Sequence, residues 1–295
     1  MKKSYSIISI VLFSLLSIIS SAGIAIYMNV KGISYTSSEG NVYVMLIFII
    51  SGLSALIACA IGRGSLNGLG YKPRFKGKGI YYLIAWLSPV ALAVLGAIIY
   101  FLFNPGDFDL DMSLMKQTLS AQGVSQRSVG RMFWTQLLGG LFLAPFFNIL
   151  TCGMEELGFR GFLFAAVKER TSVKAAVLIT SIAWGIWYVP LATIGYRYGK
   201  EASILPWRGM TLIFLFCVLT GCIACLFRLR TGSIIPGALF RSVLNGFSTI
   251  AIWFMADAYN SYIGPAMWGV LGGLPLLISG AVCFFLCTKQ TTAKV

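Results

Sequence analysis

The chain alternates long apolar runs with short polar segments along nearly its whole length. Each run is long enough to cross a hydrocarbon core about 30 Å thick as a helix, and none has the alternating pattern of a barrel strand. The pattern therefore predicts an all-α, polytopic integral membrane protein with about eight transmembrane helices. The predicted spans lie near 5–28, 42–61, 80–103, 132–154, 173–192, 209–227, 232–254 and 264–286.

The polar segments divide the chain into three regions. Residues 1–131 hold the first three spans and the longest polar segment, 104–131, in which we expect a short interfacial helix. Residues 132–250 hold the next four spans, and residues 251–295 hold the last helix and a tail. We find no solenoid repeat, no low-complexity tract and no second domain.

Composition agrees with this membrane class. Hydrophobic residues make up 58% of the chain and charged residues 11%, and the mean hydropathy is +0.84. A soluble domain could not bury so much apolar surface. The net charge of +14 could indicate a nucleic-acid partner, but the basic residues lie at the ends of the predicted helices, where membrane proteins place them. We therefore expect a lipid bilayer and no nucleic acid.

The distribution of basic residues predicts an orientation. The first run resembles a signal peptide, but it is long and no clean small-x-small site follows it, so we expect it to stay as an anchor. With eight spans both termini lie on one side. If that side is the cytoplasm, 14 of the 23 Lys and Arg residues are cytoplasmic and seven are external. This asymmetry favours cytoplasmic termini.

Seven cysteines fall within or at the ends of predicted spans. Cys222 and Cys225 form a C-x-x-C pattern, but it lies inside an apolar helix without a partner pair. We expect these residues to be small core side chains, with no disulfide framework.

The stretch GMEELGFRGFLF, residues 153–164, places charge in one of the most apolar parts of the chain. An ionisable side chain inside a span costs roughly 2.5–3.5 kcal/mol and usually serves a function. Glu156 and Arg160 are separated by four residues, which favours an ion pair on one helix face. Glu155 points about 100° away and can serve another partner. The alternative is an interfacial helix whose charges reach toward water.

Two later patterns supply possible partners. In SIAWGIWYVP, residues 181–190, the aromatic residues are of the kind that usually packs in a core or at a membrane interface. In TGSIIPGALFRSVLNG, residues 231–246, Arg241 and Asn245 share a helix face. A buried arginine needs acceptors, and the nearest supply is the pair of glutamates. We therefore expect the fourth, fifth and seventh spans to meet around a polar pocket, which requires a bend near Pro145, Asn148 or Gly153.

These three patterns resemble the motifs of the CPBP family, the intramembrane CAAX-processing and bacteriocin-processing proteases also called Abi. The first motif, Glu-Glu-x-x-x-Arg, is complete. The second, an aromatic followed four residues later by histidine, has Tyr188 at the histidine position. The third, a histidine followed four residues later by asparagine, has Arg241 at the histidine position. The resemblance covers roughly 132–250, and its motif positions are Glu155, Glu156, Arg160, Trp184, Tyr188, Arg241 and Asn245.

The resemblance implies a zinc-dependent site in active members, in which the first glutamate activates water and the histidines and asparagine hold the metal or the oxyanion. This chain contains no histidine. The remaining oxygen donors suit magnesium or calcium better than zinc, and a guanidinium in the pocket would repel a cation. We therefore expect no metal or other cofactor. Instead, Arg241 should pair with Glu155 or Glu156, and the Tyr188 hydroxyl should donate to the same cluster.

The resemblance thus implies a catalytically degenerate protein of a bacterial plasma membrane. It would bind a membrane peptide or protein, in bacteriocin immunity or envelope regulation. The alternative is an active CAAX-processing type of endopeptidase, with Glu155 as general base and Arg241 and Asn245 as oxyanion donors. A transporter or channel would show paired broken helices in two halves, and the sequence lacks such symmetry. The oligomeric state is left open.

Overall fold

The computed structural model describes residues 5–62, 66–199 and 206–288. In these ranges the backbone is helical with connecting turns, and one isolated bridge joins Phe108 to Met255. Six helices are long and apolar enough to cross a membrane, and a bent pair raises the number to seven. The predicted all-α, polytopic fold is therefore confirmed. Six of the basic residues counted for orientation lie outside the described ranges, namely Lys2, Lys3, Arg63, Lys200, Lys289 and Lys294.

The long helices follow the predicted apolar runs closely. The cap of the first shows why it starts where it does: the Ser6 hydroxyl accepts the Ser9 N–H, and Gly32 ends the helix at φ 65. Five helices cover five of the predicted spans, each to within about a turn. They are α1 (Ile7–Lys31), α2 (Ser38–Gly62), α3 (Gly79–Phe103), α9 (Val173–Thr193) and α11 (Pro206–Thr231).

The fourth predicted span belongs to a longer bent helix. Its two halves, Gln126–Phe147 and Ile149–Lys168, meet at Asn148 with a bend of 54°. The predicted bend is therefore found, at Asn148, one of the three residues where it was expected. Pro145, three residues earlier, favours it because proline lacks the backbone N–H that would continue the helical hydrogen bonds. The elements in order are η2 (Gln126–Ser128), α5 (Val129–Leu138), the π-helix η3 (Gly139–Leu143), α6 (Ala144–Phe147), α7 (Ile149–Glu156), the π-helix η4 (Leu157–Leu163) and α8 (Phe164–Lys168).

The C-terminal third departs from the prediction of an eighth full span. The seventh span consists of α12 (Ile235–Phe247) and the 3₁₀-helix η5 (Ile250–Phe254). The predicted span 264–286 is wrong in its first third, because α13 begins only at Leu274 and has 15 residues (Leu274–Thr288). At 1.5 Å per residue it is about 22 Å long. The segment before it is rich in glycine and contains Pro265, which favours turns over helix.

The segment between α3 and α5 forms the expected short helix. This is α4 (Ser113–Ser120), preceded by the 3₁₀ turn η1 (Pro105–Asp107). The Asp109 carboxylate accepts the N–H groups of Asp111 and Ser113. Hydrogen bonds from Ser113 and Asp111 hold the pKa of Asp109 below its usual value.

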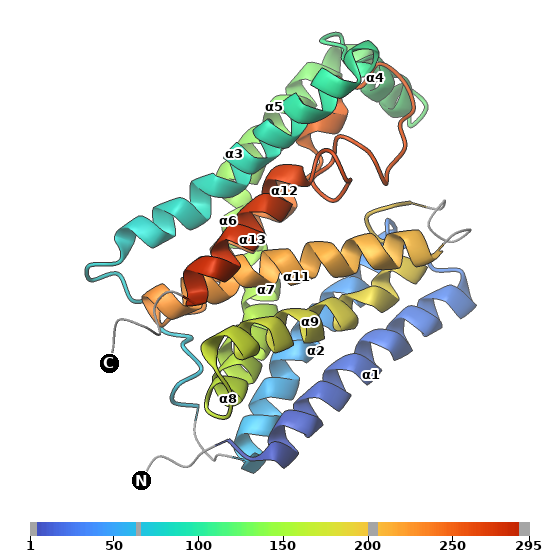
Figure 1. Cartoon of the computed structure of the whole chain (residues 1–295). Coiled ribbons are helices and arrows are strands. Elements are labelled where there is room, and N and C mark those ends of the chain that lie inside the picture. The colour runs from blue at the N-terminus through green and yellow to red at the C-terminus, as the bar shows by residue number, and fades with distance from the viewer. Residues whose placement is uncertain (1–4, 63–65, 200–205, 289–295) are drawn as a thin grey trace.

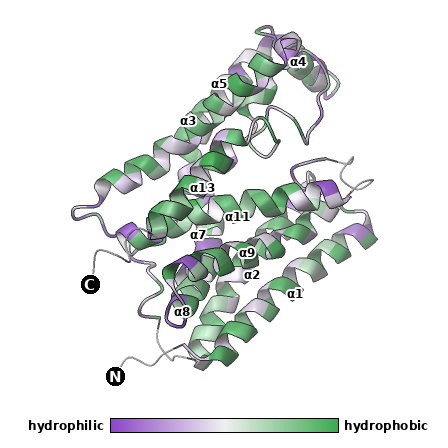
Figure 2. Ribbon diagram, viewed as in Figure 1, coloured by the Kyte–Doolittle hydropathy of each residue, from purple (hydrophilic) through white to green (hydrophobic). Residues whose placement is uncertain are grey.

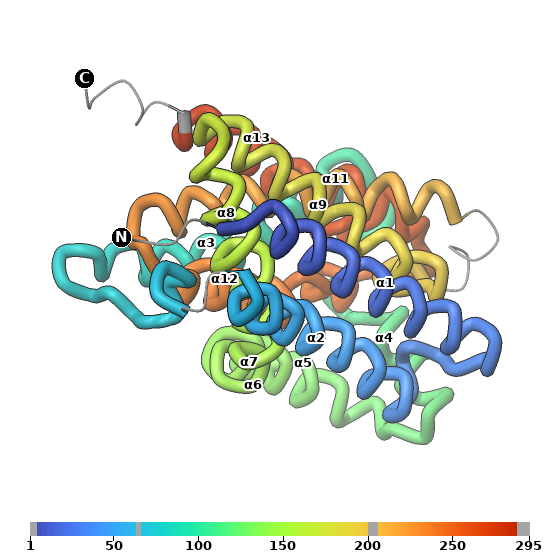
Figure 3. The backbone as a smooth tube through the Cα atoms, turned by 90° about the horizontal axis from the view of Figure 1, so that it is seen from below, coloured from blue at the N-terminus to red at the C-terminus, as the bar shows by residue number. Residues whose placement is uncertain are grey.

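The helices are arranged so that the bent helix enters the centre of the bundle. α9 lies between α1 and α11, and α12 lies against α3, α7 and α11. α7 contacts both α2 and α12, as the views in Figures 1 and 3 show. Hydrophobic residues cover the outer faces of the long helices (Figure 2), as expected for helices in lipid. The end of α7 and the start of η4 are therefore enclosed by α2, α9 and α12.

Candidate functional site

The predicted pair of Glu156 and Arg160 exists at the junction of α7 and η4. The guanidinium Nη1 lies 3.0 Å from the carboxylate Oε1, and the two side chains are 1% and 0% exposed. This burial excludes the alternative of charges that reach toward water. Neither Glu156 oxygen makes a hydrogen bond to a described residue, so the contact is ionic without good hydrogen-bond geometry.

Glu155 faces a different side, toward α9 and α12. Its Oε1 accepts the indole N–H of Trp184 at 2.6 Å. Arg241 Nη2 lies 3.4 Å from the same oxygen and 3.5 Å from Oε2. The predicted pairing of Arg241 with a glutamate across spans is therefore confirmed, and the partner is Glu155.

The two histidine positions of the motifs are in direct contact. Arg241 Nη2 donates to the Tyr188 hydroxyl at 2.7 Å. In this bond the Tyr188 hydroxyl accepts, because a guanidinium has donors only. The bond therefore does not test the expectation that the Tyr188 hydroxyl also donates its own proton to the cluster. Both side chains are buried.

Trp184 connects the two ion pairs. The guanidinium carbon of Arg160 lies 4.1 Å from the centre of a Trp184 ring, and that of Arg241 lies 4.8 Å away. Each geometry is that of a cation–π contact. The sequence indicated packing for this residue, and the structure adds a hydrogen bond to Glu155 and contacts with both arginines. Trp187, by contrast, packs as expected, against Phe159 and Phe48.

Asn245 lies one turn beyond Arg241 but takes part in a separate set of contacts. Its Oδ1 accepts from Arg197 Nη2 at 2.7 Å, and its Nδ2 lies 3.5 Å from Cys152 Sγ. Arg197 lies in the turn after α9 at φ 76, and its guanidinium stacks over Trp268 at 4.1 Å. From the sequence, Arg197 is one of the seven basic residues expected on the external side. Its position between two tyrosines is a weak signal, and only the folded chain brings it to Asn245.

Two glycines allow the helices to approach the Glu156–Arg160 pair. A Cβ at Gly237 would lie 2.6 Å from Glu156 Oε2, and one at Gly221 would lie 2.9 Å from Arg160 Nη2. Any other residue at these positions would collide with the charged side chains. The close approach of α11 and α12 therefore depends on glycine.

The side chains of this cluster do not offer the ligands that a zinc ion needs. Each carboxylate already faces a guanidinium, and the chain has no imidazole to supply the nitrogen ligands that catalytic zinc prefers. Among the described residues no group of three His, Cys, Asp or Glu side chains is arranged to hold a metal ion. Two glutamates and two arginines sum to zero formal charge, so the cluster is balanced by its own side chains.

The seven cysteines are free thiols. Six of them are buried, as expected for small core side chains, and Cys283 is half-buried.

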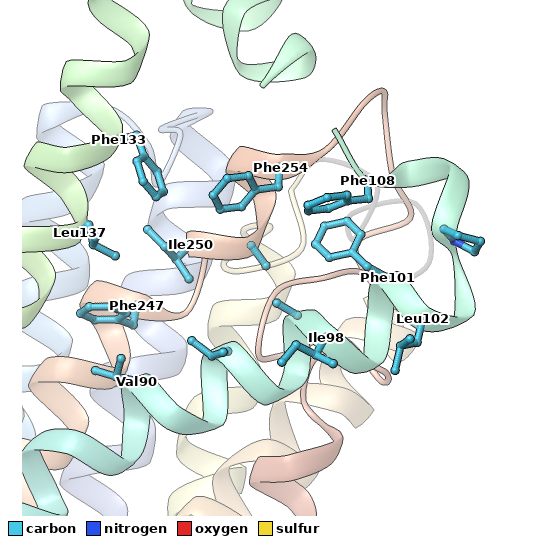
Figure 4. A pocket seen from close by; sticks show the side chains of 14 residues that line it. Val90, Ile98, Phe101, Leu102, Phe108, Phe133, Leu137, Phe247, Ile250 and Phe254 are labelled. Carbon is cyan, nitrogen blue, oxygen red and sulfur yellow. The ribbon is translucent and has the colours of Figure 1, made fainter. Parts of the chain in front are cut away.

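An apolar groove lies near the C-terminal end of α12, where Phe247 lines it. It has a volume of about 540 Å³ and is lined by side chains from α3, η1, α5, α12 and η5. Figure 4 shows Phe101, Phe108, Phe133 and Phe254 around it. Its lining contains no charged residue, so the groove offers a surface for hydrocarbon or for an apolar peptide side chain.

The segment that carries this site is similar to known CAAX prenyl proteases. Residues 132–247 match the family model described as type II CAAX prenyl endopeptidase Rce1-like. A curated relative, CAAX prenyl protease 2 of Methanococcus maripaludis, is 32% identical over 122 residues. The alignment covers 41% of this chain and 43% of the relative, so less than half of the relative's length is matched. All the motif positions, from Glu155 to Asn245, lie inside the matched segment.

Proposed function

Because its core makes this chain a member of the CAAX-protease-like CPBP (Abi) family of membrane proteins, we propose that it is a catalytically degenerate member that binds a membrane peptide or protein. One observation carries this proposal. Arg241, at one histidine position of the family motifs, donates to Tyr188 at the other and faces Glu155, the position of the general base.

A general base must be free to accept a proton from water. The Glu155 carboxylate already accepts the Trp184 indole N–H at 2.6 Å and faces a guanidinium on the same oxygen. Oε1 is thus engaged by two protein donors, and only Oε2, 3.5 Å from the same guanidinium, remains for a water molecule. The sites that would hold a metal are occupied by a phenol and a guanidinium. These side chains support a structural role for the cluster.

That structural role is to join three segments of the membrane domain. Glu155 comes from α7, Trp184 and Tyr188 from α9, and Arg241 from α12. Buried charges in lipid are costly unless paired, so each segment depends on the others for its partner. The cluster thus holds the core of the bundle in one arrangement.

The proposed binding surface is the apolar groove between α3, α5 and η5. Its lining has no charged side chain, which suits an apolar membrane peptide. The family resemblance offers bacteriocin immunity and envelope regulation as settings. The same proposal places the chain in a bacterial plasma membrane with both termini in the cytoplasm, in agreement with the excess of basic residues on that side.

A second function has one observation in its favour. The contacts from Arg241 to Glu155 are 3.4 and 3.5 Å, which is long for a charge-assisted hydrogen bond. An active endopeptidase would use Glu155 as the base and Arg241 and Asn245 as oxyanion donors. Against it, the side-chain hydrogen-bond partners of Asn245 among the described residues are Arg197 and Cys152, not the glutamate.

The test separates the two functions directly. Wild-type protein and Glu155→Gln are purified in nanodiscs and incubated with prenylated and unprenylated CAAX peptides, and products are measured by mass spectrometry. We expect no product that depends on Glu155 and no stoichiometric zinc by elemental analysis. A product that appears with the wild type and disappears with Glu155→Gln would establish the endopeptidase instead.

A photo-crosslinking amino acid tests the binding surface. Placed at Phe133 in the groove, it should crosslink to a peptide or protein partner in native membranes. At Phe147, which is 78% exposed and lies outside the groove lining, it should crosslink mainly to lipid. Equal protein crosslinking at both positions would argue against the groove.

A further inference from the structure

Basic residues gather at the end of the bundle where α8 and α11 terminate. This basic end also includes the loop between α2 and α3 and the start of α9. Among the described residues it carries nine Lys and Arg side chains and one carboxylate, Glu169. The basic residues are Lys72, Arg74, Lys76, Lys78, Lys168, Arg170, Lys174, Arg228 and Arg230. Figure 2 shows hydrophilic colour at the end of α8. Such an excess of positive charge attracts an anion.

A cavity of about 370 Å³ lies within the basic end. Its lining has an apolar part and a polar part. Phe164, Ala165 and Leu229 form an apolar part, and Lys168, Glu169, Arg228 and Gly232 form a polar part. An occupant that matches both parts has a charged head and a hydrocarbon portion.

Arg228 supplies fixed positive charge at this cavity. Its Nε donates to the Arg160 carbonyl at 3.2 Å, and its terminal nitrogens donate to the carbonyls of Gly68 and Gly232. These three acceptors are neutral, so they orient the guanidinium without cancelling its charge. A guanidinium has five N–H donors, so the three bonds leave further donors for an anion.

Two other cations border the same cavity. Lys168 lines it directly and is exposed. Arg74 lies against its edge, since a Cβ at Gly232 would be 2.8 Å from Arg74 Nη1. Glu169 also lines the cavity, and its carboxylate accepts the Tyr5 N–H at 3.1 Å, which leaves its negative charge in place. The three cations Lys168, Arg228 and Arg74 outnumber this carboxylate, so the balance of charge at the cavity is positive.

We propose that this cavity binds the headgroup of an anionic membrane phospholipid. Lys168 and Arg228, with Arg74 at the edge, contact the phosphate, and Phe164 and Leu229 contact the upper part of an acyl chain. A phospholipid fits both the charge of the polar part and the hydrocarbon character of the rest. The site is separate from the Glu155 cluster and from the apolar groove.

The test uses matched lipids and matched variants. The purified full-length protein in detergent is titrated with phosphatidylglycerol or with phosphatidylcholine of the same chains, and bound lipid is quantified by native mass spectrometry. The variants are Lys168→Gln and Arg74→Gln, with Arg127→Gln as control, since Arg127 is exposed at the opposite end of the bundle. Arg228 is left intact because it connects three backbone segments.

We expect phosphatidylglycerol to bind more tightly than phosphatidylcholine. Each of Lys168→Gln and Arg74→Gln should weaken phosphatidylglycerol about five-fold, the effect of one basic residue near an anionic surface, while Arg127→Gln should not. Equal affinity for both lipids, or an equal loss with Arg127→Gln, would overturn the proposal. If glycerol phosphate or an acidic peptide displaces the lipid at equal concentration, the site binds any anion and the assignment to a phospholipid is wrong.

Discussion

Arg241 donates to the hydroxyl of Tyr188 at 2.7 Å, so the two positions where the family motifs carry histidine contact each other across α9 and α12. The same guanidinium faces Glu155. The two positions at which the resemblance implies metal ligands thus hold one buried donor and one buried acceptor. The consequences can be measured.

The first prediction concerns the ion pair itself. Arg241→Leu leaves the Glu155 carboxylate buried without its cation and should lower the free energy of unfolding by about 3–5 kcal/mol. Thermal unfolding in detergent measures this. Combining Arg241→Leu with Glu155→Leu removes both charges and should restore part of the loss. An unchanged unfolding temperature in Arg241→Leu would show that the pair does not stabilise the fold.

The second prediction concerns Tyr188 and Arg241, the two histidine positions of the motifs. The double variant Tyr188→His, Arg241→His removes the guanidinium and supplies two imidazoles, the nitrogen ligands that catalytic zinc prefers, beside the negative carboxylate of Glu155. We expect this variant to bind about one zinc ion by elemental analysis, while the wild type does not. The control is the same variant with Glu155→Gln, which should bind zinc more weakly. A folded double variant without zinc would mean that the site is closed to metal for another reason.

The third prediction concerns Gly237. Gly237→Ala places a Cβ 2.6 Å from Glu156 Oε2 and should destabilise the protein by about 1–3 kcal/mol through overpacking. Gly153→Ala is the control, because a Cβ there meets no atom within 4 Å and alanine favours the helix. Thermal unfolding should show a loss for the first and no loss for the second. Equal effects would contradict the close approach.

The fourth prediction concerns Arg197. Arg197→Gln removes the guanidinium that bonds to Asn245 and stacks on Trp268, so the turn after α9 should open more often. Hydrogen exchange of the backbone around 194–199 and 261–268 should become faster. Arg208→Gln, an exposed arginine at the start of α11, should leave both segments unchanged. Unchanged exchange in Arg197→Gln would show that this contact does not hold the turn.

The fifth prediction concerns pH and α4. Hydrogen bonds from Ser113 and Asp111 lower the pKa of Asp109 in the folded protein. A lowered pKa stabilises the fold above the unfolded value of about 3.9, and this contribution is lost as the pH falls through the folded value. The protection of the Ser113 amide, measured as its exchange rate relative to an unstructured peptide at the same pH, should therefore fall below about pH 4. In Asp109→Asn the protection should no longer depend on pH in this range, and a persisting dependence would assign it to another group.

Local patterns in the sequence were sufficient for much of the architecture. Apolar runs determine where α1, α2, α3, α9 and α11 lie, because a helix in lipid must satisfy its own backbone. The pairing of Glu156 with Arg160 follows from a spacing of one helical turn. The spacing of the motifs also predicted that seven residues, from Glu155 to Asn245, belong to one site.

Contacts between distant segments could not be predicted in the same way. The sequence left open whether Arg241 pairs with Glu155 or Glu156, and the structure decides for Glu155, because Arg160 faces Glu156. Arg197 and Asn245 are 48 residues apart, and their contact depends on the turn after α9. The glycine-rich start of the last predicted span also resembled a helix by hydropathy alone.

The sequence by itself thus determined the membrane class, the long helices and the identity of the charged cluster. Only the tertiary structure decided which charges meet, that Trp184 touches both arginines, and that Asn245 faces Arg197 instead of a glutamate. The physical reason is the separation along the chain over which each interaction acts. Helix formation and one-turn spacing act within a few residues, whereas the partner of a buried charge is set by how α7, α9 and α12 pack together.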